Sequence, residues 1–343
     1  MRAAVFQGIG KGHKIESVPE PSPGPDDVLI RVEQSGICAT DLTITGQRKQ
    51  ASPLDAMFEI LGRPGTILGH EFAGEIVAIG AGVERLKVGD RVAPGGMSGC
   101  GGCLTCLSGK PDWCAVGHAK MGGYAEYALA HENSCALVPK SLAVGDTALI
   151  EPLAVCLHAM NLAGTVAGKR VLIFGAGPMG LGLAHLARRF GASQVAVVAR
   201  TNRHAALAGE MGCDAFLTQG DDLVTRVRDT LGSEADLVFE TSGAGGAMDQ
   251  AIGCAGRQGT ILSLAMPALP DTIFHTSAMM KEIRIQYCFS YIIDELRVAA
   301  EILARGEVQF NRIVTRRVSF DEFPEAFESL RGGSPDCKVV LAV

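Results

Sequence analysis

One glycine-rich turn limits the folds open to this chain more than any other feature. Residues 170–174 (RVLIF) form a short apolar run, and Gly175, Gly177 and Gly180 follow at once in GAGPMG. The next residues, LGLAHLARRFGA, have the spacing of an amphipathic helix. A glycine turn between a buried strand and a helix binds the pyrophosphate of a dinucleotide, because glycine lets the backbone approach the phosphates and the helix N-terminus presents free N–H groups. We therefore predict a dinucleotide-binding fold, with a purely structural glycine turn as the alternative.

Further apolar runs predict the sheet that accompanies this turn. They lie at residues 194–199, 215–217, 237–240, 260–264 and 283–287, with helix-period segments between them. Strands that alternate with helices build a parallel, doubly wound sheet, and continuous hydrophobicity is typical of strands covered on both faces. The expected fold class is α/β, and the run at 283–287 is a candidate edge strand for pairing between subunits.

The end of the second strand indicates which dinucleotide binds. NAD sites place an acidic residue about 20 residues beyond the first glycine, whereas NADP sites place arginine there to meet the 2′-phosphate. Here residues 199–203 read ARTNR, and no acidic residue occurs between Gly180 and Gly209. We predict NADP(H), with NAD(H) and merely solvated arginines as the alternative. The residues expected to contact the cofactor are Gly175, Gly177, Pro178, Met179, Gly180, Ala199, Arg200 and Arg203.

Four of the eleven cysteines are clustered, at Cys100, Cys103, Cys106 and Cys114. In a reducing compartment, closely spaced cysteines hold a metal more often than they form disulfides. The spacing C-x2-C-x2-C-x7-C supplies four thiolates on one loop, which is the ligand set of a structural zinc site. An iron–sulfur cluster is the competing interpretation. Its fourth cysteine usually follows after about three residues and precedes proline, a pattern that this loop lacks.

A second set of candidate metal ligands is dispersed along the chain. Cys38 lies in SGICATD, His70 and Glu71 lie in LGHEFAGEI, and Glu151 lies in IEPLAV, each beside residues typical of a strand end or turn. Together they supply a thiolate, an imidazole and carboxylates, the mixture that a catalytic zinc with an open position requires. Taken singly, such a cysteine or histidine is more often a packing residue. Spacing alone leaves open whether they converge.

Composition and charge exclude several other classes. Hydrophobic residues make up 47% and charged residues 20%, which excludes a disordered chain. A net charge of -6 leaves no basic surface for nucleic acid or anionic lipid. The longest uncharged apolar stretch, after Glu151, contains Pro152 and His158 and is a poor membrane span, and the N-terminus lacks the apolar part of a secretion signal. We therefore expect a soluble cytoplasmic protein whose partners are neither nucleic acid nor membrane.

In their order, these motifs resemble the zinc-containing medium-chain alcohol dehydrogenases, specifically the polyol (sorbitol-like) and threonine dehydrogenase branch. The resemblance covers essentially the whole chain. It rests on CATD at Cys38, GHEFAGEIVAIGAGVERLKVGDRV from Gly69, the four-cysteine segment, GGYAEYALA from Gly122, EPLAV from Glu151 and GAGPMG from Gly175.

The resemblance implies two domains with the active site in the cleft between them. Residues 1–152 and 289–343 would form a GroES-like, β-rich catalytic domain with a structural zinc lobe at about 95–118, and residues 153–288 a Rossmann coenzyme domain. The pattern of the tail agrees with a return to the catalytic domain. It indicates a helix at 294–305, a strand at 313–318, a helix at 321–331 and a closing strand at 338–343.

The resemblance also implies two zinc ions per chain, one catalytic and one structural. Cys38, His70 and Glu71 match the catalytic positions. Glu151 matches a carboxylate that ligates the metal directly, holds its water or exchanges with Glu71. Family members are commonly homodimers or homotetramers.

Thr40 and Asp41, which follow Cys38, are expected to have supporting roles. Thr40 matches the hydroxyl that begins proton relay from the bound alcohol, and a strand threonine bonded to backbone is its alternative. Asp41 is expected to sit in a turn or to orient a ligand rather than to exchange protons.

Three departures limit what the family implies about the substrate. Thr43 stands where these enzymes often carry histidine, and residues 289–291 read FSY in place of Phe-Arg-Tyr. The segment 46–66 is longer than usual. Because such loops border the substrate pocket, sorbitol itself is not implied.

Three functions remain open at this point. The leading one is a zinc-dependent alcohol dehydrogenase that uses NADP(H) on a secondary alcohol or its ketone, such as a polyol or cyclitol. The alternatives are a zinc-free quinone or enoyl reductase of the same superfamily and a non-enzymatic NADPH-binding protein.

Overall fold

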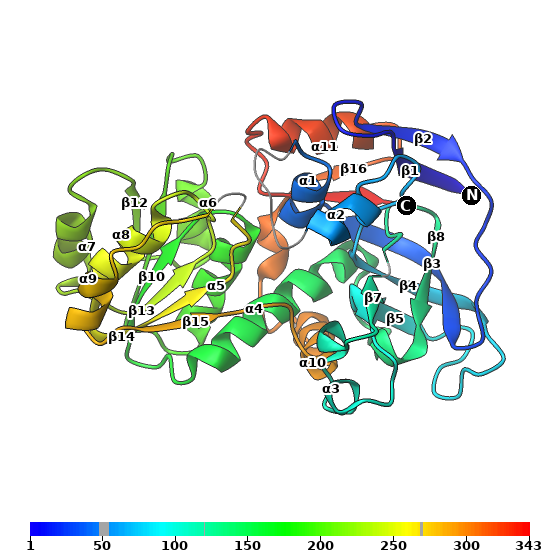
Figure 1. Ribbon diagram of the computed structural model, residues 1–343, viewed down its shortest axis with the longest axis horizontal. Helices are drawn as coiled ribbons and strands as arrows, with labels where there is room; N and C mark the ends of the chain where they lie inside the picture. The colour runs from blue at the N-terminus through cyan, green and yellow to red at the C-terminus, as the bar shows by residue number, and fades with distance from the viewer. Residues whose placement is uncertain (48–54, 120, 268–269) are drawn as a thin grey trace. The chain divides into compact units, whose positions relative to one another are not determined.

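The chain divides into two compact units, seen in the computed structural model in Figure 1. The structure describes residues 1–47, 55–119, 121–267 and 270–343. The first unit comprises Met1–Ala154, Tyr291–Glu307 and Val314–Val343, and the second comprises Val155–Ser290 and Val308–Ile313.

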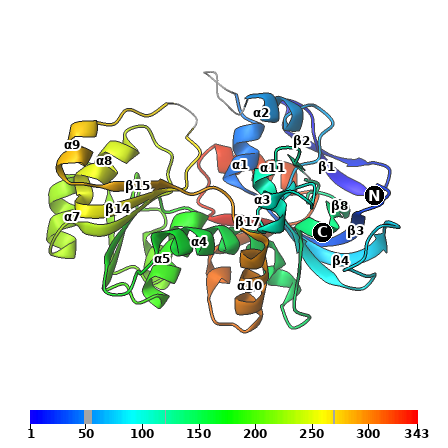
Figure 2. The same cartoon turned by 60° about the horizontal axis from the view of Figure 1, so that its bottom comes forward.

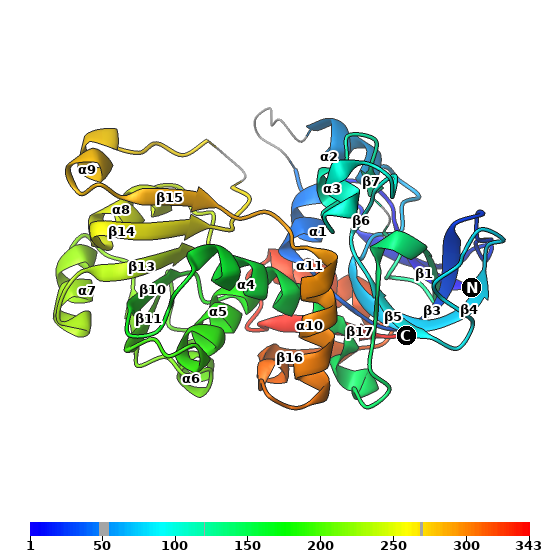
Figure 3. The same cartoon turned by 90° about the horizontal axis from the view of Figure 1, so that it is seen from below.

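The second unit is built on a six-stranded parallel sheet in the order β12-β11-β10-β13-β14-β15. Its strands are β10 (Arg170–Phe174), β11 (Gln194–Ala199), β12 (Ala215–Thr218), β13 (Ala235–Glu240), β14 (Ala255–Ser263) and β15 (Arg284–Tyr287). Figure 3 shows β15, β14, β13 and β10 side by side in this order. All six apolar runs that the sequence analysis singled out form strands, and β15 is an edge strand.

The strand order reverses direction next to β10, and this reversal distributes the helices. The helices are α4 (Ile150–Ala163), α5 (Pro178–Arg189), α6 (Ala205–Glu210), α7 (Leu223–Leu231), α8 (Ala247–Cys254) and α9 (His275–Met280), and the chain passes from the first unit to the second within α4. Right-handed crossovers from β10 to β11 and from β13 to β14 run in opposite directions, so α5 and α8 cover opposite faces (Figure 2). Ligands of such sheets bind at the carboxyl ends of the strands beside this reversal.

The first unit is built mainly from antiparallel strands. Its largest sheet has the order β16-β17-β3-β4-β5-β9, with β8 paired to β3. These strands are β3 (Asp27–Gly36), β4 (Glu71–Ile79), β5 (Arg91–Pro94), β8 (Tyr127–His131), β9 (Cys135–Leu137), β16 (Val314–Val318) and β17 (Lys338–Ala342), and the small sheets pair β1 (Arg2–Phe6) with β2 (His13–Ser17) and β6 (Met97–Ser98) with β7 (His118–Ala119). Because β17 pairs with β3, the end of the chain lies beside Gly36.

Short helices complete the first unit. They are α1 (Ala39–Ile44), α2 (Asp55–Leu61), α3 (Leu104–Leu107), α10 (Ile293–Ala304), α11 (Phe323–Arg331), η1 (Pro111–Trp113), η2 (Glu132–Ser134) and η3 (Val144–Leu149). The long segment 46–66 contains α2, and its residues 48–54 lie outside the described residues. Within the described ranges, no helix combines the length and the apolarity that a bilayer crossing requires.

The tail departs from the expected domain division. The expected boundaries after residues 152 and 288 lie two residues from those of the structure, but residues 308–313 belong to the second unit rather than the first. Phe310, in η4 (Phe310–Ile313), is fully buried there, and a Cβ at Gly182 of α5 would lie 2.3 Å from its ring. Glycine at position 182 therefore lets the ring pack on the helix. Burying a side chain of this size contributes about 2 kcal/mol, which accounts for the detour.

A buried aromatic cluster joins β2 to α11 in the first unit. The ring centroid of His13 lies 4.3 Å from that of Phe327 and 5.5 Å from that of Phe323. The His13 side chain is 7% exposed, and neither ring nitrogen has a hydrogen-bond partner among the described residues. Burial outweighs the opposing charge of Asp41 and, together with the nearby Arg331, lowers the pKa of His13 to about 4.

This histidine makes the stability of the first unit depend on pH. The unfolded chain takes up the proton at an ordinary pKa of 6.5, whereas the folded chain resists protonation until about 4. Stability is therefore lost as the pH falls through this window, by about 3 kcal/mol in total. We expect His13→Met, which puts an apolar side chain of similar volume into the cluster, to remove this part of the pH dependence. Urea denaturation between pH 7.5 and pH 4.5 measures the free energy of unfolding of the wild type and of His13→Met. If this free energy fell equally with pH in both proteins, His13 would not be the cause.

Candidate active site and metal centres

Three of the dispersed ligands converge in the first unit. Cys38 is the N-cap of α1, just after β3 ends, and His70 directly precedes Glu71, the first residue of β4. Because Gly36 of β3 pairs with Glu71 of β4, the end of one strand lies beside the start of the other. The ligand atoms of Cys38, His70 and Glu71 all lie within 4.8 Å of one another.

Asp41 holds two of these ligands in place. It is fully buried, and one carboxylate oxygen accepts hydrogen bonds from the Cys38 amide at 3.2 Å and the Tyr124 hydroxyl at 2.5 Å. The other oxygen lies 3.4 Å from His70 Nδ1. Burial raises the pKa of Asp41, but His70 and these hydrogen bonds outweigh it and bring that pKa below its ordinary value. The carboxylate therefore stays ionised beside Nδ1, which leaves Nε2 as the histidine nitrogen available to a metal.

Glu71 forms an ion pair with a buried lysine that the sequence analysis did not single out. Lys338, at the start of β17, is 2% exposed; its Nζ pairs with the Glu71 carboxylate and donates to the carbonyl of Ile37 at 3.0 Å. Burial lowers the pKa of Lys338, but the charge of Glu71 raises it above its ordinary value. The pair lies against Gly36, where a Cβ would stand 2.1 Å from Glu71 Oε2 and 2.9 Å from Lys338 Cε. Only glycine leaves room for this pair.

The donor set fits a divalent metal. Burial and the charge of Glu71 raise the pKa of the Cys38 thiol, so an anionic thiolate at this place needs a cation beside it. One sulfur, one imidazole and one carboxylate at mutual reach are the ligands of a catalytic zinc that keeps an open position.

Glu151 lies outside this group of ligand atoms. It was expected beside a strand end or turn, but it occupies the first turn of α4, half-buried. Burial is the main cause that raises the pKa of Glu151 to about 7. Burial, followed by the charge of Glu151, also raises the pKa of Tyr291, whose hydroxyl oxygen accepts from the Gly96 amide at 3.3 Å. The helix is favoured here because the preceding residues already form the 3-10 turn η3, which runs directly into α4.

Thr40 and Thr43 lie on helix α1. The strand position considered for Thr40 is therefore wrong: its side chain is half-buried in the first helical turn, and its amide donates to Cys38 Sγ at 3.5 Å. The capping role of Cys38 and Asp41 starts a helix here. The Thr43 hydroxyl donates to the carbonyl of Ala39 at 3.0 Å and so is occupied by its own helix.

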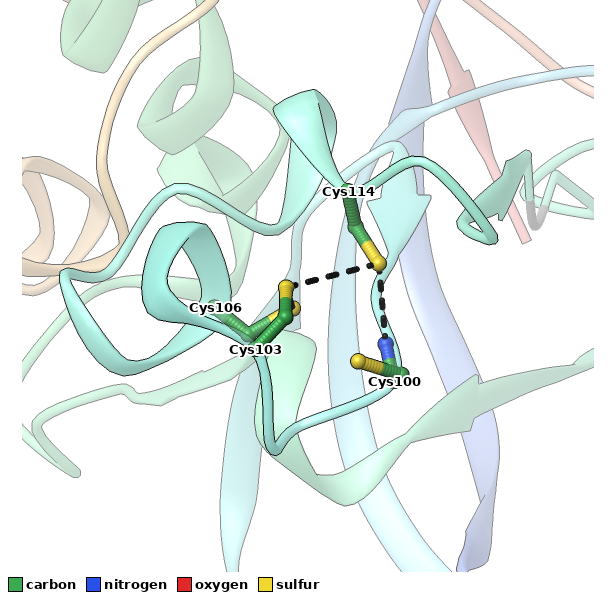
Figure 4. Close-up of side chains that lie close together, drawn as sticks. All are labelled: Cys100, Cys103, Cys106 and Cys114. Atoms are coloured by element: carbon green, nitrogen blue, oxygen red, sulfur yellow. Dashed lines mark hydrogen bonds between the residues drawn. The ribbon is translucent and has the colours of Figure 1, made fainter.

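The four clustered cysteines form a second candidate metal centre around α3 (Figure 4). Cys103 Sγ lies 3.5 Å from Cys106 Sγ and 3.8 Å from Cys114 Sγ, and the Cys100 amide donates to Cys114 Sγ at 3.4 Å. Four sulfurs around one tetrahedral zinc stand about 3.8 Å apart, given a Zn–S bond of about 2.3 Å. A hydrogen bond from Thr105 lowers the pKa of Cys103 to about 6, which favours the thiolate. The spacing fits a single zinc better than a cluster in which each sulfur binds a different iron.

The glycine turn of the second unit has the geometry of a phosphate cradle. Gly175 has φ +107°, and a Cβ at Gly180 would lie 1.9 Å from the Gly175 carbonyl, so both are required by the protein itself. A Cβ at Gly177, the N-cap of α5, would meet nothing within 4 Å. Space kept open at a helix N-terminus suits a pyrophosphate, which fits a dinucleotide at this turn.

The loop that follows β11 lies against this turn. His204 Nδ1 is 2.8 Å from the carbonyl of Ala176, which ties the loop to the glycine turn. Arg200 and Arg203, in the same loop after Ala199, are exposed. Both arginines therefore belong to the segment that borders the ribose of a dinucleotide in this fold.

Comparison with known proteins decides the family. The alcohol dehydrogenase GroES-like domain matches residues 24–140, and the zinc-binding dehydrogenase domain matches residues 178–305. A sorbitol dehydrogenase of Halalkalibacterium halodurans is 32% identical over 353 residues and is covered, like this chain, to 99%. The chain belongs to the zinc-containing medium-chain alcohol dehydrogenases. An L-threonine 3-dehydrogenase of Saccharopolyspora erythraea, 30% identical over 97% of this chain and 96% of its own, places this dehydrogenase in the polyol and threonine branch.

A solved structure supports the same assignment. A zinc-binding dehydrogenase from Sinorhizobium meliloti 1021, bound to NADP, matches this dehydrogenase with a TM-score of 0.84 at 29% identity, over 100% of this chain and 99% of that one. The predicted family and fold class are thus confirmed, and the relatives support an oxidoreductase that acts on small molecules.

Sequence reasoning missed two residues of the site in this dehydrogenase. Lys338 lies in the closing apolar strand CKVVLAV, where a lysine amid buried residues is itself a signal of a buried partner. Tyr124 stands in the quoted motif GGYAEYALA, but its hydrogen bond to Asp41 depends on a contact between distant segments.

Proposed function

We propose that this protein is a zinc-dependent oxidoreductase that transfers a hydride between NADP(H) and a secondary alcohol/ketone pair, with a polyol, cyclitol or related hydroxylated compound as substrate. The observation that carries the proposal is the convergence of Cys38 with His70 and Glu71 from two separate segments of the chain, backed by Asp41 and Lys338. A zinc-free reductase of the same superfamily has no need of this buried set. The proposal includes two zinc ions per chain, the second in the four-cysteine lobe.

The residues of the site divide the work of the reaction. When bound, zinc acts as a Lewis acid that makes the substrate hydroxyl more acidic, and the nicotinamide takes up the hydride. Cys38, His70 and Glu71 would hold the metal, while Asp41 keeps the His70 ring in one orientation. Thr40 Oγ1, half-buried beside Cys38, would take the proton that the substrate hydroxyl loses. Since the Thr43 hydroxyl already donates to its own helix, the proton would leave Thr40 by another route.

The two carboxylates have different roles in this proposal. Glu71 is fully buried and held by Lys338, whereas Glu151 is half-buried and outside the group of ligand atoms. Glu151 would thus serve as the exchangeable partner, which contacts the metal or its water when Glu71 does not.

The cofactor preference rests on charge at the loop after β11. Arg200 and Arg203 are exposed in a loop fixed to the glycine turn through His204, and no carboxylate there repels a 2′-phosphate. Arginine pairs with phosphate through charge-assisted, often bidentate hydrogen bonds. The relative from Sinorhizobium meliloti, solved with NADP, is in keeping with this choice.

Removing one of these arginines should weaken NADP+ selectively. Hydrogen bonds to charged groups contribute about 1.5–3 kcal/mol, so Arg200→Ala should lower kcat/KM for NADP+ by about 10- to 100-fold and change that for NAD+ little. The matched control is Arg228→Ala, which removes an exposed arginine of α7 that pairs with Glu234. It should change kcat/KM for neither cofactor. Initial rates with both cofactors measure this. A wild-type kcat/KM for NAD+ equal to or above that for NADP+ would sink the NADP(H) proposal.

The proposed substrate class rests on the names of the relatives and on two differences between this chain and the family pattern. Relatives named for sorbitol, L-threonine and D-arabitol phosphate act on compounds with a secondary hydroxyl. Ser290 replaces an arginine that could bind sugar hydroxyls, and the segment 46–66 is long, so sorbitol itself is not proposed. The testing experiment is a panel of sugar alcohols, cyclitols, amino alcohols and simple secondary alcohols with NADP+ and NAD+, beside zinc quantification. About one zinc per chain and no alcohol oxidation would favour a reductase or a binding protein instead.

Assembly and location complete the proposal. We propose a homodimer or homotetramer that pairs through β15, an edge strand with Tyr287 68% exposed and Phe289 60% exposed just beyond it. Light scattering of the intact protein measures the assembly directly, and a monomer would refute it. All eleven cysteines are described and none forms a disulfide, so a cytoplasmic location, which keeps thiols reduced, suits both metal centres.

A further inference from the structure

Buried, connected charges are packed around the candidate catalytic site. Asp41, Glu71 and Lys338 are 0%, 2% and 2% exposed, and the Cys38 thiol stands among them. Charges this far from water interact strongly, because little solvent screens them. The balance of charge in this group therefore acts directly on any metal that it binds.

Lys338 contacts this group at two points. Its Nζ forms the ion pair with Glu71, one of the three candidate ligands, and donates to the carbonyl of Ile37 at 3.0 Å, the residue before Cys38. The close approach over Gly36 shows that the strands are built to admit the pair, since any side chain there would overlap the Glu71 carboxylate. The lysine is thus a fixed part of the site.

Lys338 offsets part of the negative charge of the site. With Cys38 as a thiolate, Cys38, Asp41 and Glu71 carry three negative charges, and Glu151 lies near enough for its charge to act on Lys338. Lys338 supplies one positive charge against this set. Without the lysine, the loaded site would carry one more negative charge beside the substrate oxygen, which opposes the loss of the substrate's proton.

We propose that Lys338 is a positioning residue that fixes the Glu71 carboxylate and sets the net charge of the catalytic zinc site. It weakens zinc binding by its positive charge and in return makes the substrate hydroxyl easier to deprotonate. The part that concerns turnover rests on the function proposed above, whereas the part that concerns zinc affinity rests on the metal site alone.

The first test is Lys338→Met, which removes the charge and keeps most of the volume. Zinc should bind the catalytic site about tenfold more tightly or more, while kcat falls about tenfold or more, because a positive charge has been removed beside a divalent ion. A lysine that served only the fold would give the opposite result for zinc, since its loss would loosen the site. Zinc binding no tighter than in the wild type would overturn the proposal.

A second pair of variants keeps the test decisive if Lys338→Met does not fold. Glu71→Gln leaves the buried ammonium without its partner and should weaken zinc binding about 100-fold or more. Adding Lys338→Met to Glu71→Gln should recover about tenfold of this loss or more. Equal zinc affinities for the single and the double variant would refute the charge role of Lys338.

The measurement is a competition between the protein and a chelating dye for the zinc at the site of Cys38, His70 and Glu71. Emission of Trp113, the sole tryptophan, which lies between Cys106 and Cys114, verifies that the four-cysteine site stays loaded. Lys281→Met is the matched control: Lys281 Nζ donates to three carbonyls of α8 and β14 in the second unit, and its loss should leave zinc binding unchanged. If the proposed dehydrogenase function failed, no alcohol would be oxidised by the wild type, yet the zinc affinities would still follow this order.

Discussion

Replacing Cys38 with alanine should lower kcat by about 10³-fold or more and leave one zinc per chain in place of two. The thiolate is the anionic sulfur of the candidate catalytic site, and the zinc it helps to hold would supply several kcal/mol of stabilisation to the transition state, at about 1.4 kcal/mol per tenfold in rate. The fold should persist, because Cys38 is only half-buried and α1 keeps Asp41 as a partner of its first turn. Initial rates and metal analysis of the purified variant measure both effects.

Cys135→Ala is the matched control for this variant. Cys135 is a buried cysteine on β9 of the same unit and is not among the candidate ligands. It should keep both zinc ions and most of the activity. If Cys38→Ala retained wild-type turnover, the sulfur would have no part in the reaction and the proposed mechanism would be refuted.

Cys103→Ser should empty the four-cysteine site and lower the stability of the first unit by more than about 4 kcal/mol, since losing a structural metal is among the costliest single changes. Cys103 Sγ lies 3.5 Å from Cys106 Sγ and 3.8 Å from Cys114 Sγ. Trp113 lies in the same loop with the Lys110 ammonium 4.6 Å from its ring. Loosening of the loop should therefore change the tryptophan emission as well as the thermal unfolding of this unit.

The control for the lobe is Cys213→Ser, which alters a half-buried cysteine of the second unit. It should leave the zinc content and the Trp113 emission as in the wild type. A Cys103→Ser protein with two zinc ions and an unchanged melting temperature would show that the lobe does not depend on metal.

The centre of the parallel sheet could be predicted because β10, β11 and β13 are covered on both faces and so carry continuous apolar runs. The boundaries were less accessible. The sequence predicts a strand from residue 260, but β14 begins at Ala255. Its first residues (AGRQG) form no apolar run, and Ala255 joins the sheet by pairing with Ala235 of β13. The local sequence pattern shows which side chains pack in the core. It does not show this extension of β14, which depends on pairing with the backbone of β13.

The ligands of both metal centres could be proposed from residue types and motifs, but their supports could not. Lys338 pairs with Glu71 only because β17 returns to lie beside β3, and Tyr124 reaches Asp41 from a different segment again. The detour of Phe310 into the second unit has the same origin, since it depends on the space above Gly182. These contacts join residues far apart in the chain, and no local periodicity encodes them.

The most direct test of the central claim is the activity of the protein as zinc is returned to it. Zinc-free protein is reconstituted stepwise, and the rate of NADPH formation from the best alcohol of the panel is plotted against zinc bound per chain. We expect almost no activity from protein in which the four-cysteine site alone holds zinc, and full activity once the site of Cys38, His70 and Glu71 holds zinc as well. Full activity without zinc, or with the four-cysteine site alone occupied, would contradict the central claim.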